Sequence, residues 1–360
     1  MHNSLRKFCG GFCVLLLIVF LFSSFSSAQQ AAGSGKGIVK VMNYNLNEGT
    51  DFTEVLSAQT FPDFLTAVQI TLNSVEASNP PLRMQAIAHQ IAINQPDLVG
   101  LEEVTTWRVG PGPNPTAVRY DMLQELLDAL KAQGQHYAAV AVVNQFQLQG
   151  PLPDLVNFVS ASDTDVLLAR SDEGDLQLSN VQSANYSTLL TFPTLLGPLT
   201  ILRGWGSVDV NLHGQAFRFI VTHLENAVPG VPATVLVQEA QAGELIAGPA
   251  NTSFPVIIAG DFNANAADSS DPTFATYQEM LSSGFGDAWT ATHPRSPGLT
   301  WQLVDSSPVD TAAQRIDFIF FRGPMRAKVS SLAGSDPHDK VGGVWPSDHA
   351  GVRALLRVGE

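Results

Sequence analysis

Short apolar runs that end in polar side chains recur along the chain, and the clearest of them lies within residues 255–265. The stretch from Val256 to Ala259 is apolar, rich in β-branched side chains and bounded by proline and glycine, which is typical of a strand buried on both faces. Asp261 and Asn263 follow it. Because alternate residues of an extended chain point the same way, this carboxylate and this amide can face one site. An Asx-type turn that closes the strand would explain the same two residues.

Other apolar runs predict further strands, and several of them also end in polar side chains. Glycine at position 214, after a histidine, predicts a hairpin turn between two of these strands. The predicted strands lie at residues 38–46, 98–101, 137–143, 165–168, 206–210, 216–224, 315–321 and 352–358.

Helical periodicity fills most of the intervals between these strands. The stretch that Pro80 opens and Pro96 ends is the clearest, because its apolar residues repeat at a spacing of three and four. Further helices are predicted within residues 51–79, 121–131, 234–246 and 276–281. Strands and helices alternate loosely, with hairpins among them. This pattern predicts mixed sheets covered by helices rather than a parallel barrel.

Two segments are predicted to lie outside regular elements. Residues 105–116 are rich in glycine and proline and predict a loop. Residues 188–202 are apolar, but their two prolines argue against one continuous central element. This second segment is either a loop packed on the core or an exposed apolar flap that touches lipid or a hydrophobic substrate.

The N-terminus has the layout of a secretory signal. Arg6 and Lys7 precede an apolar run at residues 12–22, and small residues follow as far as Ala28. The run is short for a membrane span. We therefore expect residues 1–28 to be a cleaved signal peptide, residues 29–36 a flexible tether and residues 37–360 one domain, secreted or periplasmic and without a stable membrane span.

Cysteine usage and charge narrow the class of protein. Cys9 and Cys13 both lie in the predicted signal, so the mature chain should have no disulfide and no cysteine metal site. The formal net charge of -14 becomes still more negative when the two basic residues of the signal are removed. This acidity disfavours a long electrostatic footprint on nucleic acid. It does not exclude a nuclease, because a bound cation supplies local positive charge.

The polar residues at the predicted strand ends form a set of hard oxygen ligands and two imidazoles, without sulfur. Such a set favours Mg²⁺ or Mn²⁺ over zinc. These ions coordinate phosphate, neutralise developing charge and lower the pKa of bound water. Phosphoester hydrolysis requires all three effects. The set is Asn45, Glu103, His223, Asp261, Asn263, Asp317, Asp348 and His349.

Six short motifs contain these residues, and their ordered set resembles the endonuclease/exonuclease/phosphatase superfamily. That superfamily includes deoxyribonuclease I-like nucleases, abasic-site endonucleases, inositol polyphosphate 5-phosphatases and neutral sphingomyelinases. The resemblance implies an α/β fold of four layers, in which two mixed β-sheets pack face to face with helices on the outer faces and the site lies at one edge. The motifs are Asn43-Tyr44-Asn45, Leu101-Glu102-Glu103-Val104, Thr222-His223-Leu224, Gly260-Asp261-Phe262-Asn263, Arg315-Ile316-Asp317-Phe318 and Ser347-Asp348-His349.

The resemblance also implies a role for each matched residue. Glu103 should hold the cation, with Asn45 and Asp348 beside it. Of the catalytic residues, Asp261 should orient or deprotonate the attacking water, and Asn263 should donate a hydrogen bond to a phosphate oxygen. The remaining three act on the phosphate: His223 and His349 should contact it, and Asp317 should orient His349 and favour its charged form.

Three neighbouring residues leave alternatives open. Glu102 is expected to be the solvent-facing neighbour of the metal-binding glutamate. Asp317 on its own could pair with Arg315 or with a backbone amide. Arg203 is either a phosphate contact or a structural residue stacked on Trp205.

The leading hypothesis is a secreted, divalent-metal-dependent phosphoesterase that acts on phosphodiester or phosphomonoester bonds, as a monomer. A nuclease and a sphingomyelinase-like lipid phosphodiesterase are not separated, so the substrate is either nucleic acid or a phospholipid head group. Acidity favours substrates other than genomic DNA, and the apolar segment at 188–202 would suit a lipid. A non-catalytic binding protein on the same fold is the alternative of a different class.

Overall fold

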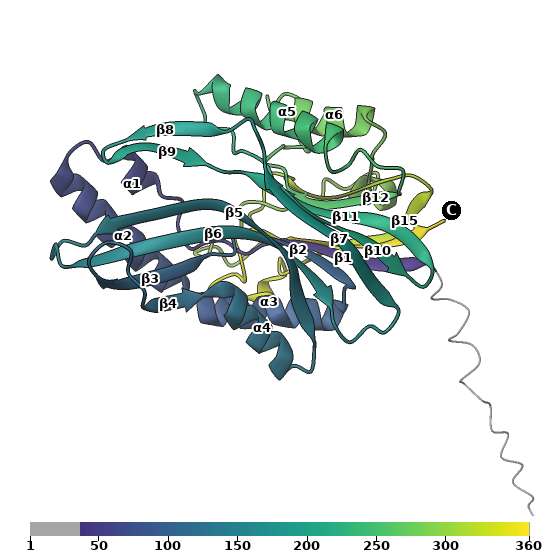
Figure 1. Ribbon diagram of the computed structural model, residues 1–360, viewed down its shortest axis with the longest axis horizontal. Coiled ribbons are helices and arrows are strands. Elements are labelled where there is room, and N and C mark those ends of the chain that lie inside the picture. Colours follow the sequence, from purple (N-terminus) through teal and green to yellow (C-terminus); the bar gives the residue numbers. More distant parts are fainter. Residues whose placement is uncertain (1–36, 360) are drawn as a thin grey trace, which may run out of the picture. The chain divides into compact units, whose positions relative to one another are not determined.

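The computed structural model describes residues 37–359, and the predicted signal peptide and tether lie outside the described residues. Its core consists of two mixed β-sheets that pack face to face, with helices on both outer faces (Figure 1). Among the described residues, no helix combines the length and apolar character needed to span a bilayer.

The first sheet has eight strands in the order β15-β16-β1-β2-β6-β3-β4, and β5 pairs with β6 beside this path. β1 and β2 run parallel, whereas β1 and β16 run antiparallel, so the sheet is mixed. Its strands are β1 (Ile38–Asn45), β2 (Leu98–Glu102), β3 (Thr106–Pro111), β4 (Val118–Asp121), β5 (Tyr137–Pro151), β6 (Asn157–Arg170), β15 (Met325–Ala333) and β16 (Gly351–Val358).

The second sheet has six strands in the order β13-β14-β12-β11-β10-β7, with β11 and β12 parallel. The predicted hairpin is confirmed between β10 and β11, where His213 and Gly214 both have positive φ, as a tight two-residue turn requires. The strands are β7 (Leu176–Asn185), β10 (Gly204–Leu212), β11 (Gln215–His223), β12 (Val256–Asp261), β13 (Gly286–Asp287) and β14 (Asp317–Arg322).

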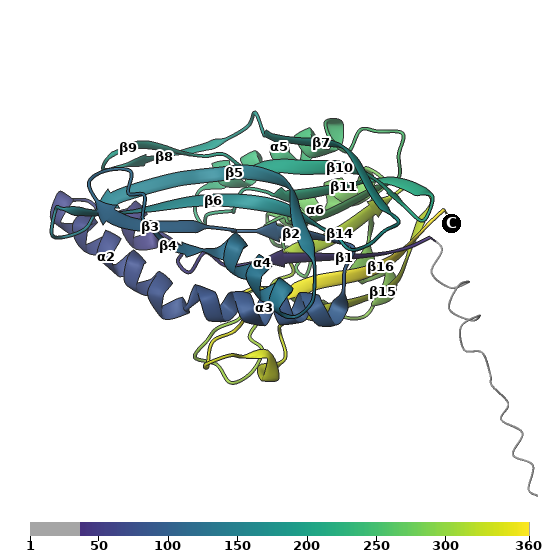
Figure 2. The ribbon, with the colours of Figure 1, turned by 60° about the horizontal axis from the view of Figure 1, so that its bottom comes forward.

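Helices cover both sheets and complete four layers, as the sequence predicted (Figure 2). Met84 of α3 and Leu126 of α4 pack with Leu101 of the first sheet, while Leu245 of α5 and Met280 of α6 belong to the core cluster of the second. The helices are α1 (Thr53–Ser57), α2 (Phe61–Ser78), α3 (Pro80–Asn94), α4 (Met122–Ala132), α5 (Pro232–Ala247), α6 (Phe274–Ser282) and α7 (Ala288–Thr292), with a 3₁₀ turn at Pro337–Asp339.

The prediction of a loop at residues 105–116 is wrong for residues 106–111 and correct for residues 112–116. Thr106–Pro111 forms β3, which pairs antiparallel with β6 and with β4. Trp107 is buried in this strand and anchors it. The glycine and proline content belongs to the end of β3 and to the turn after it. Strands β7, β4 and β15 were also missed, because they are edge strands with many exposed polar residues and carry little apolar signal.

Residues 188–202 form a two-stranded hairpin of β8 (Leu190–Thr194) and β9 (Gly197–Ile201), separate from both large sheets. Pro193 and Pro198 face each other across it, which a two-stranded ribbon tolerates because one edge of each strand is unpaired. Leu195 and Leu196 at its tip are 42% and 57% exposed. The segment is therefore an exposed apolar hairpin and not a loop packed on the core.

Candidate functional site

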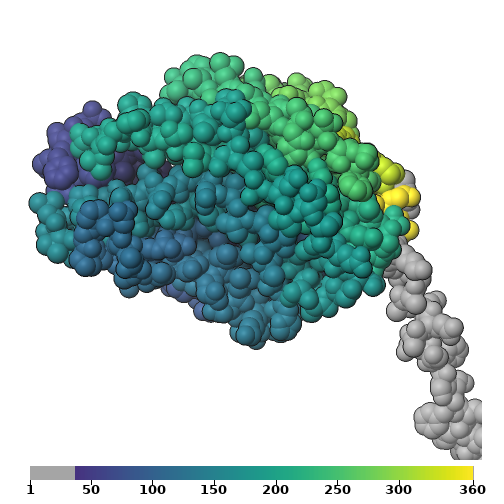
Figure 3. Space-filling view, in the orientation of Figure 1, coloured from purple at the N-terminus to yellow at the C-terminus, as the bar shows by residue number. Residues whose placement is uncertain are grey.

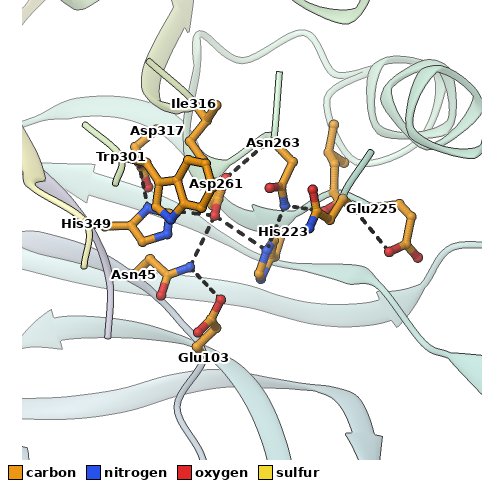
Figure 4. A network of polar contacts seen from close by, with 12 residues as sticks. Asn45, Glu103, His223, Glu225, Asp261, Asn263, Trp301, Ile316, Asp317 and His349 are labelled. Carbon is orange, nitrogen blue, oxygen red and sulfur yellow. Dashed lines mark hydrogen bonds and ion pairs between the residues drawn. The ribbon is translucent and has the colours of Figure 1, made fainter. Parts of the chain in front are cut away.

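The two sheets come together most closely near one edge of the sandwich, where β1, β2, β11 and β12 end and β14 begins. Small residues make this approach possible: a Cβ added to Gly100 of β2 would lie 3.1 Å from the Cβ of Ala259 in β12. Gly260 is equally constrained, since a Cβ there would lie 2.3 Å from the carbonyl oxygen of Thr222 in the neighbouring strand. The polar strand ends of both sheets therefore meet in one network (Figure 4).

Asn45 connects the two sheets at the centre of this network. Its Nδ2 donates to Glu103 Oε1 at 2.9 Å and to Asp261 Oδ2 at 3.1 Å. The other oxygen of Glu103 accepts from the backbone N–H of Glu48 at 3.0 Å. One amide thus holds two carboxylates from different sheets side by side.

Asp261 and Asn263 adopt both of the arrangements that the sequence left open. The backbone N–H of Asn263 donates to Asp261 Oδ1 at 2.8 Å, which is an Asx-type turn, and Asn263 has a φ of 50°. The turn leaves Asp261 Oδ2 directed at Asn45 and places the Asn263 amide beside His223. The Asx-type turn thus places the side chains of both Asp261 and Asn263 at the site.

His349 is paired with Asp317, whose Oδ2 lies 3.0 Å from His349 Nδ1. Burial alone would lower the pKa of His349, but the charges of Asp317 and Asp348 and the hydrogen bond to Asp317 outweigh it and raise the pKa well above its usual value. The imidazole is therefore protonated at neutral pH. Arg315 does not compete for Asp317, because its guanidinium bonds Asp287 at 2.5 Å and lies over the rings of aromatic neighbours.

His223 has the opposite character. Burial and the charges of Arg203 and His349 lower its pKa well below the usual value, so the ring is neutral. Arg203 Nη1 lies 2.8 Å from His223 Nδ1, and because a guanidinium only donates, Nδ1 must accept and the ring proton is assigned to Nε2. Nε2 lies 3.5 Å from Asp261 Oδ2 and 3.1 Å from Asn263 Nδ2. The Nε2–H of His223 and the side-chain amide of Asn263 therefore lie side by side next to Asp261, and the amide donates to the Leu224 carbonyl at 3.1 Å.

Arg203 is the site residue whose role the sequence did not decide. Its guanidinium bonds His223, and its Nε lies 4.0 Å from Glu225 Oε1. The sequence does contain a signal for the position of Arg203, namely the hairpin turn at residues 213 and 214. Gly204 pairs with His223 in that hairpin, so the turn alone places position 203 beside His223.

The expectation that Glu102 faces solvent is wrong. Glu102 is fully buried, and neither of its carboxylate oxygens has a hydrogen-bond partner among residues 37–359. Strand alternation explains this: Leu98, Gly100 and Glu102 point to the other sheet, whereas Glu103 follows the end of β2 with a φ of 57° and reaches the site. Burial, followed by the charge of Asp165, raises the pKa of Glu102 well above its usual range.

Asp348 is the most exposed of the carboxylates that contact His349, with 31% of its side chain exposed. Its Oδ1 is 4.0 Å from His349 Nε2, and its Oδ2 accepts from the indole N–H of Trp301 at 3.3 Å. The carboxylates that Asn45 joins are those of Glu103 and Asp261. Of the eight site residues predicted from the sequence, Asp348 is thus the one placed at the periphery.

The donor set fits a divalent cation. Carboxylate oxygens of Asp261 and Asp317 lie within 4.8 Å of each other and of His349, whose protonated ring is not itself a ligand, and Asp317 Oδ1 is buried without a hydrogen-bond partner among the described residues. Burial and the charge of Asp317 raise the pKa of Asp261 to about 7. Crowded carboxylates of this kind repel one another unless a cation lies among them, and oxygen ligands without thiolate match Mg²⁺ or Mn²⁺.

Comparison with known proteins agrees with this geometry at the level of the fold. A 20% identical structure from Beutenbergia cavernae, an endonuclease/exonuclease/phosphatase, superposes with a TM-score of 0.57 over 90% of this chain and 72% of that one. A humanized TDP2 from D. rerio gives 16% identity and a TM-score of 0.52 over 89% and 99% of the two chains. A mannosyl-6-phosphatase from Bacteroides thetaiotaomicron gives 15% identity and a TM-score of 0.54, over 88% of this chain and 99% of that one.

No curated protein matches the sequence significantly. The sequence profile described as "Endonuclease/Exonuclease/phosphatase family" matches residues 42–349, which include all eight predicted site residues. The chain therefore belongs to the endonuclease/exonuclease/phosphatase family, whose members are hydrolases that act on phosphoester bonds.

Proposed function

We propose that the protein is an exported, divalent-metal-dependent phosphoesterase that hydrolyses its substrate by attack of a metal-activated water. One observation carries this proposal. Asn45 holds the carboxylates of Glu103 and Asp261 side by side, and the potential donors His223, Asn263 and His349 all lie within 4.0 Å of one another or of Asp261. Acceptors for a cation and donors for an anion thus share one site.

Glu103 and Asn45 would hold Mg²⁺ or Mn²⁺, with Asp348 as a more distant ligand. Bound there, the ion would neutralise phosphate charge and lower the pKa of water. The carboxylate of Asp261 would accept the proton of the attacking water, whose oxygen forms the new bond to phosphorus. The bond from phosphorus to the ester oxygen breaks, that oxygen takes a proton from solvent water as it leaves, and Asp261 returns its proton to solvent.

The three donors would bind the phosphate oxygens as negative charge develops. His349 supplies a charged N–H that Asp317 orients. His223 supplies a neutral N–H, because Arg203 occupies its other nitrogen. Asn263 supplies an amide N–H, which also donates to the Leu224 carbonyl at 3.1 Å.

The substrate class stays open between nucleic acid and a lipid phosphodiester. The net charge of -14 favours substrates other than a long polyanion, and the exposed apolar β8–β9 hairpin favours the sphingomyelinase-like alternative. We further propose that residues 1–28 direct export and that the mature chain acts as a monomer.

The test is hydrolysis of bis(p-nitrophenyl) phosphate, plasmid DNA and sphingomyelin by the mature chain, each with Mg²⁺, Mn²⁺ or EDTA. We expect metal-dependent cleavage of at least one substrate, reduced at least about a thousandfold in Asp261→Ala and His349→Ala. His89→Ala is the matched control, because His89 is exposed on α3 far from the network. Cleavage that persists in EDTA, or full activity in both site variants, would contradict the proposal, and inactivity on every substrate would favour the binding-protein alternative.

A further inference from the structure

An apolar groove of about 300 Å³ runs between the β8–β9 hairpin, helices α1 and α2, and one face of β5 and β6. Figure 3 shows the hairpin, in teal, and the first helices, in purple, on the two sides of this hollow. Its volume is at the lower end of the range for small-molecule pockets, roughly 300–1,000 Å³. Its lining includes Phe52, Phe64, Trp107, Ala161, Leu196 and Leu199.

The groove has an unusual composition for this chain. Its lining contains no aspartate, glutamate, lysine, arginine or histidine, although the protein carries 33 acidic and 19 basic residues. The polar groups that reach it are the amides of Gln147 and Gln149 and the hydroxyls of Thr71 and Thr194. A phosphate would find no charge there, whereas an apolar group would exchange water for aromatic and aliphatic contacts.

One residue separates the groove from the proposed cation ligand. Trp107, which lines the groove, donates its indole N–H to the carbonyl oxygen of Glu48 at 3.2 Å. The backbone N–H of the same Glu48 donates to Glu103 Oε2 at 3.0 Å. Phe52, stacked on Trp107 with ring centroids 6.0 Å apart, extends this wall away from the site. Glu48 therefore links the groove wall to the Glu103 carboxylate, because its backbone contacts both.

Strand β6 connects the same two places along one of its faces. Val159 and Ala161 line the groove, and Asp163 and Asp165 follow on the same face as the strand enters the site. Asp165 Oδ1 lies 3.8 Å from His223 Nδ1. Two residues of a strand span about 7 Å, so Ala161 in the groove and Asp163 at the acidic end of β6 are separated by less than the length of a small molecule.

The hairpin that roofs the groove is attached to the catalytic network. Leu202, at the end of the hairpin, donates its backbone N–H to the carbonyl of Gln145 at 2.6 Å. The next residue is Arg203, which holds His223. The tip contributes Leu196, which is 57% exposed and so has apolar surface left to cover.

We propose that the groove binds an apolar chain of the substrate while its phosphoester lies between Glu103 and Asp261. The substrate is then a phosphodiester that carries a flexible aliphatic substituent, and not a polynucleotide. This inference rests on the proposed function and narrows its substrate class. The occupant is one chain of the substrate itself.

The experiment compares methyl, butyl and octyl p-nitrophenyl phosphate as substrates of the mature protein with Mg²⁺. We expect kcat/KM to rise with chain length, by up to about fourfold for each methylene that is fully buried, until the groove is filled. Leu196→Asp should abolish this dependence on chain length. Leu195→Asp is the matched control, because Leu195 is its exposed neighbour at the same tip and does not line the groove.

A second pair of variants is used in case Leu196→Asp impairs folding, which thermal melting would reveal. Leu56→Asp changes an exposed lining residue on α1, and Ile70→Asp changes a comparably exposed residue on α2 that lies outside the lining. Only Leu56→Asp should remove the dependence of kcat/KM on chain length. Equal kcat/KM for the three esters, or equal effects of Leu196→Asp and Leu195→Asp, would overturn the inference while leaving the proposed function intact.

Binding separates the two possible failures. Octylphosphonate and methylphosphonate are titrated calorimetrically into the wild type and into Leu196→Asp. Suppose that no ester is hydrolysed, and that octylphosphonate binds more tightly than methylphosphonate to the wild type but not to Leu196→Asp. The groove then binds an apolar chain as inferred, and the proposed function fails. If the two phosphonates bind equally, the inference fails. Gel filtration of the same proteins tests a second copy as occupant: a dimer that Leu196→Asp dissociates would also overturn it.

Discussion

The space between the two sheets has two halves of opposite character. Toward one end it is filled by aliphatic and aromatic side chains, among them Val41, Val208, Phe217 and Phe219, all at most 2% exposed. At the site end, the side chains that face inward are polar and equally buried. Each has at least one atom without a hydrogen-bond partner among residues 37–359: Asn43, Glu102, Asp163, Asp165 and Asp317.

This contrast separates what stabilises the fold from what the fold supports. Burying apolar surface contributes about 25 cal/mol for each Å² removed from water, whereas an unpartnered buried carboxyl is destabilising. A protein that needed only stability would fill both halves alike. The polar half is therefore held in place by the apolar half, and its unpartnered atoms are what the proposed binding of a cation and a phosphate would require.

The largest effect should come from the apolar half. Phe219→Ala removes a fully buried ring from the middle of the sandwich and should lower the free energy of unfolding by about 3–5 kcal/mol. The folded fraction should retain the wild-type kcat. Urea denaturation measures the loss, and Phe254→Ala, at a phenylalanine that is 40% exposed, is the control. A loss of kcat at full folding would mean that the two halves are not separable.

Replacing Arg203 should have an intermediate effect, on activity. In Arg203→Met the Nδ1 of His223 loses its donor, and kcat should fall about 10–100-fold with little change in KM. The positive charge of Arg203 helps to lower the pKa of His223, so this pKa should rise toward its ordinary value of about 6.5. The wild type already loses activity as the pH falls below the Asp261 pKa of about 7, and the variant should lose activity more steeply over the same range because His223 also becomes protonated.

Arg170→Met is the control for this change, because Arg170 pairs with Asp172 outside the network. NMR of the histidine ring nitrogens reports the tautomer directly. If His223 keeps its proton on Nε2 and the pH profile is unchanged, Arg203 has only a structural role.

The smallest effect should be a gain in stability at the polar half. Burial, followed by the charge of Glu103, raises the pKa of Asp163 to about 7. Because the pKa in the folded state exceeds that of the unfolded chain, about 3.9, the stability linked to this group is present below pH 4 and is lost as the pH rises toward 7. Asp163→Asn removes that loss and can still accept the hydrogen bond that Thr105 donates to Oδ1 at 2.8 Å.

We therefore expect Asp163→Asn to be more stable than the wild type at pH 8 in EDTA, and the difference to vanish near pH 4. The slope between these limits cannot exceed about 1.4 kcal/mol for each pH unit. Thermal melting across this range measures it. Asp128→Asn, at an exposed position on α4, should show no such trend.

Much of the fold and of the site could be read from local pattern. The buried run before Asp261 and the helical stripe of α3 appear in the structure as predicted, because alternation and turn chemistry act within a few residues. The same holds for the polar ends of β1, β11 and β14, and this is why seven of the predicted site residues lie in one network.

Other features depended on contacts between distant segments. Which of Glu102 and Glu103 enters the site follows from the side of β2 that faces the second sheet, and the β3 strand exists because β6 offers it a partner. Arg203 acquires its role from a strand register, and the apolar groove from a hairpin that folds back over β5 and β6. The sequence by itself determined the buried strands with strong apolar runs, their polar ends and the chemistry that these ends carry. The tertiary structure alone decided which buried acids remain unpartnered and where the apolar groove lies, since both depend on how two separate sheets and a hairpin pack against one another.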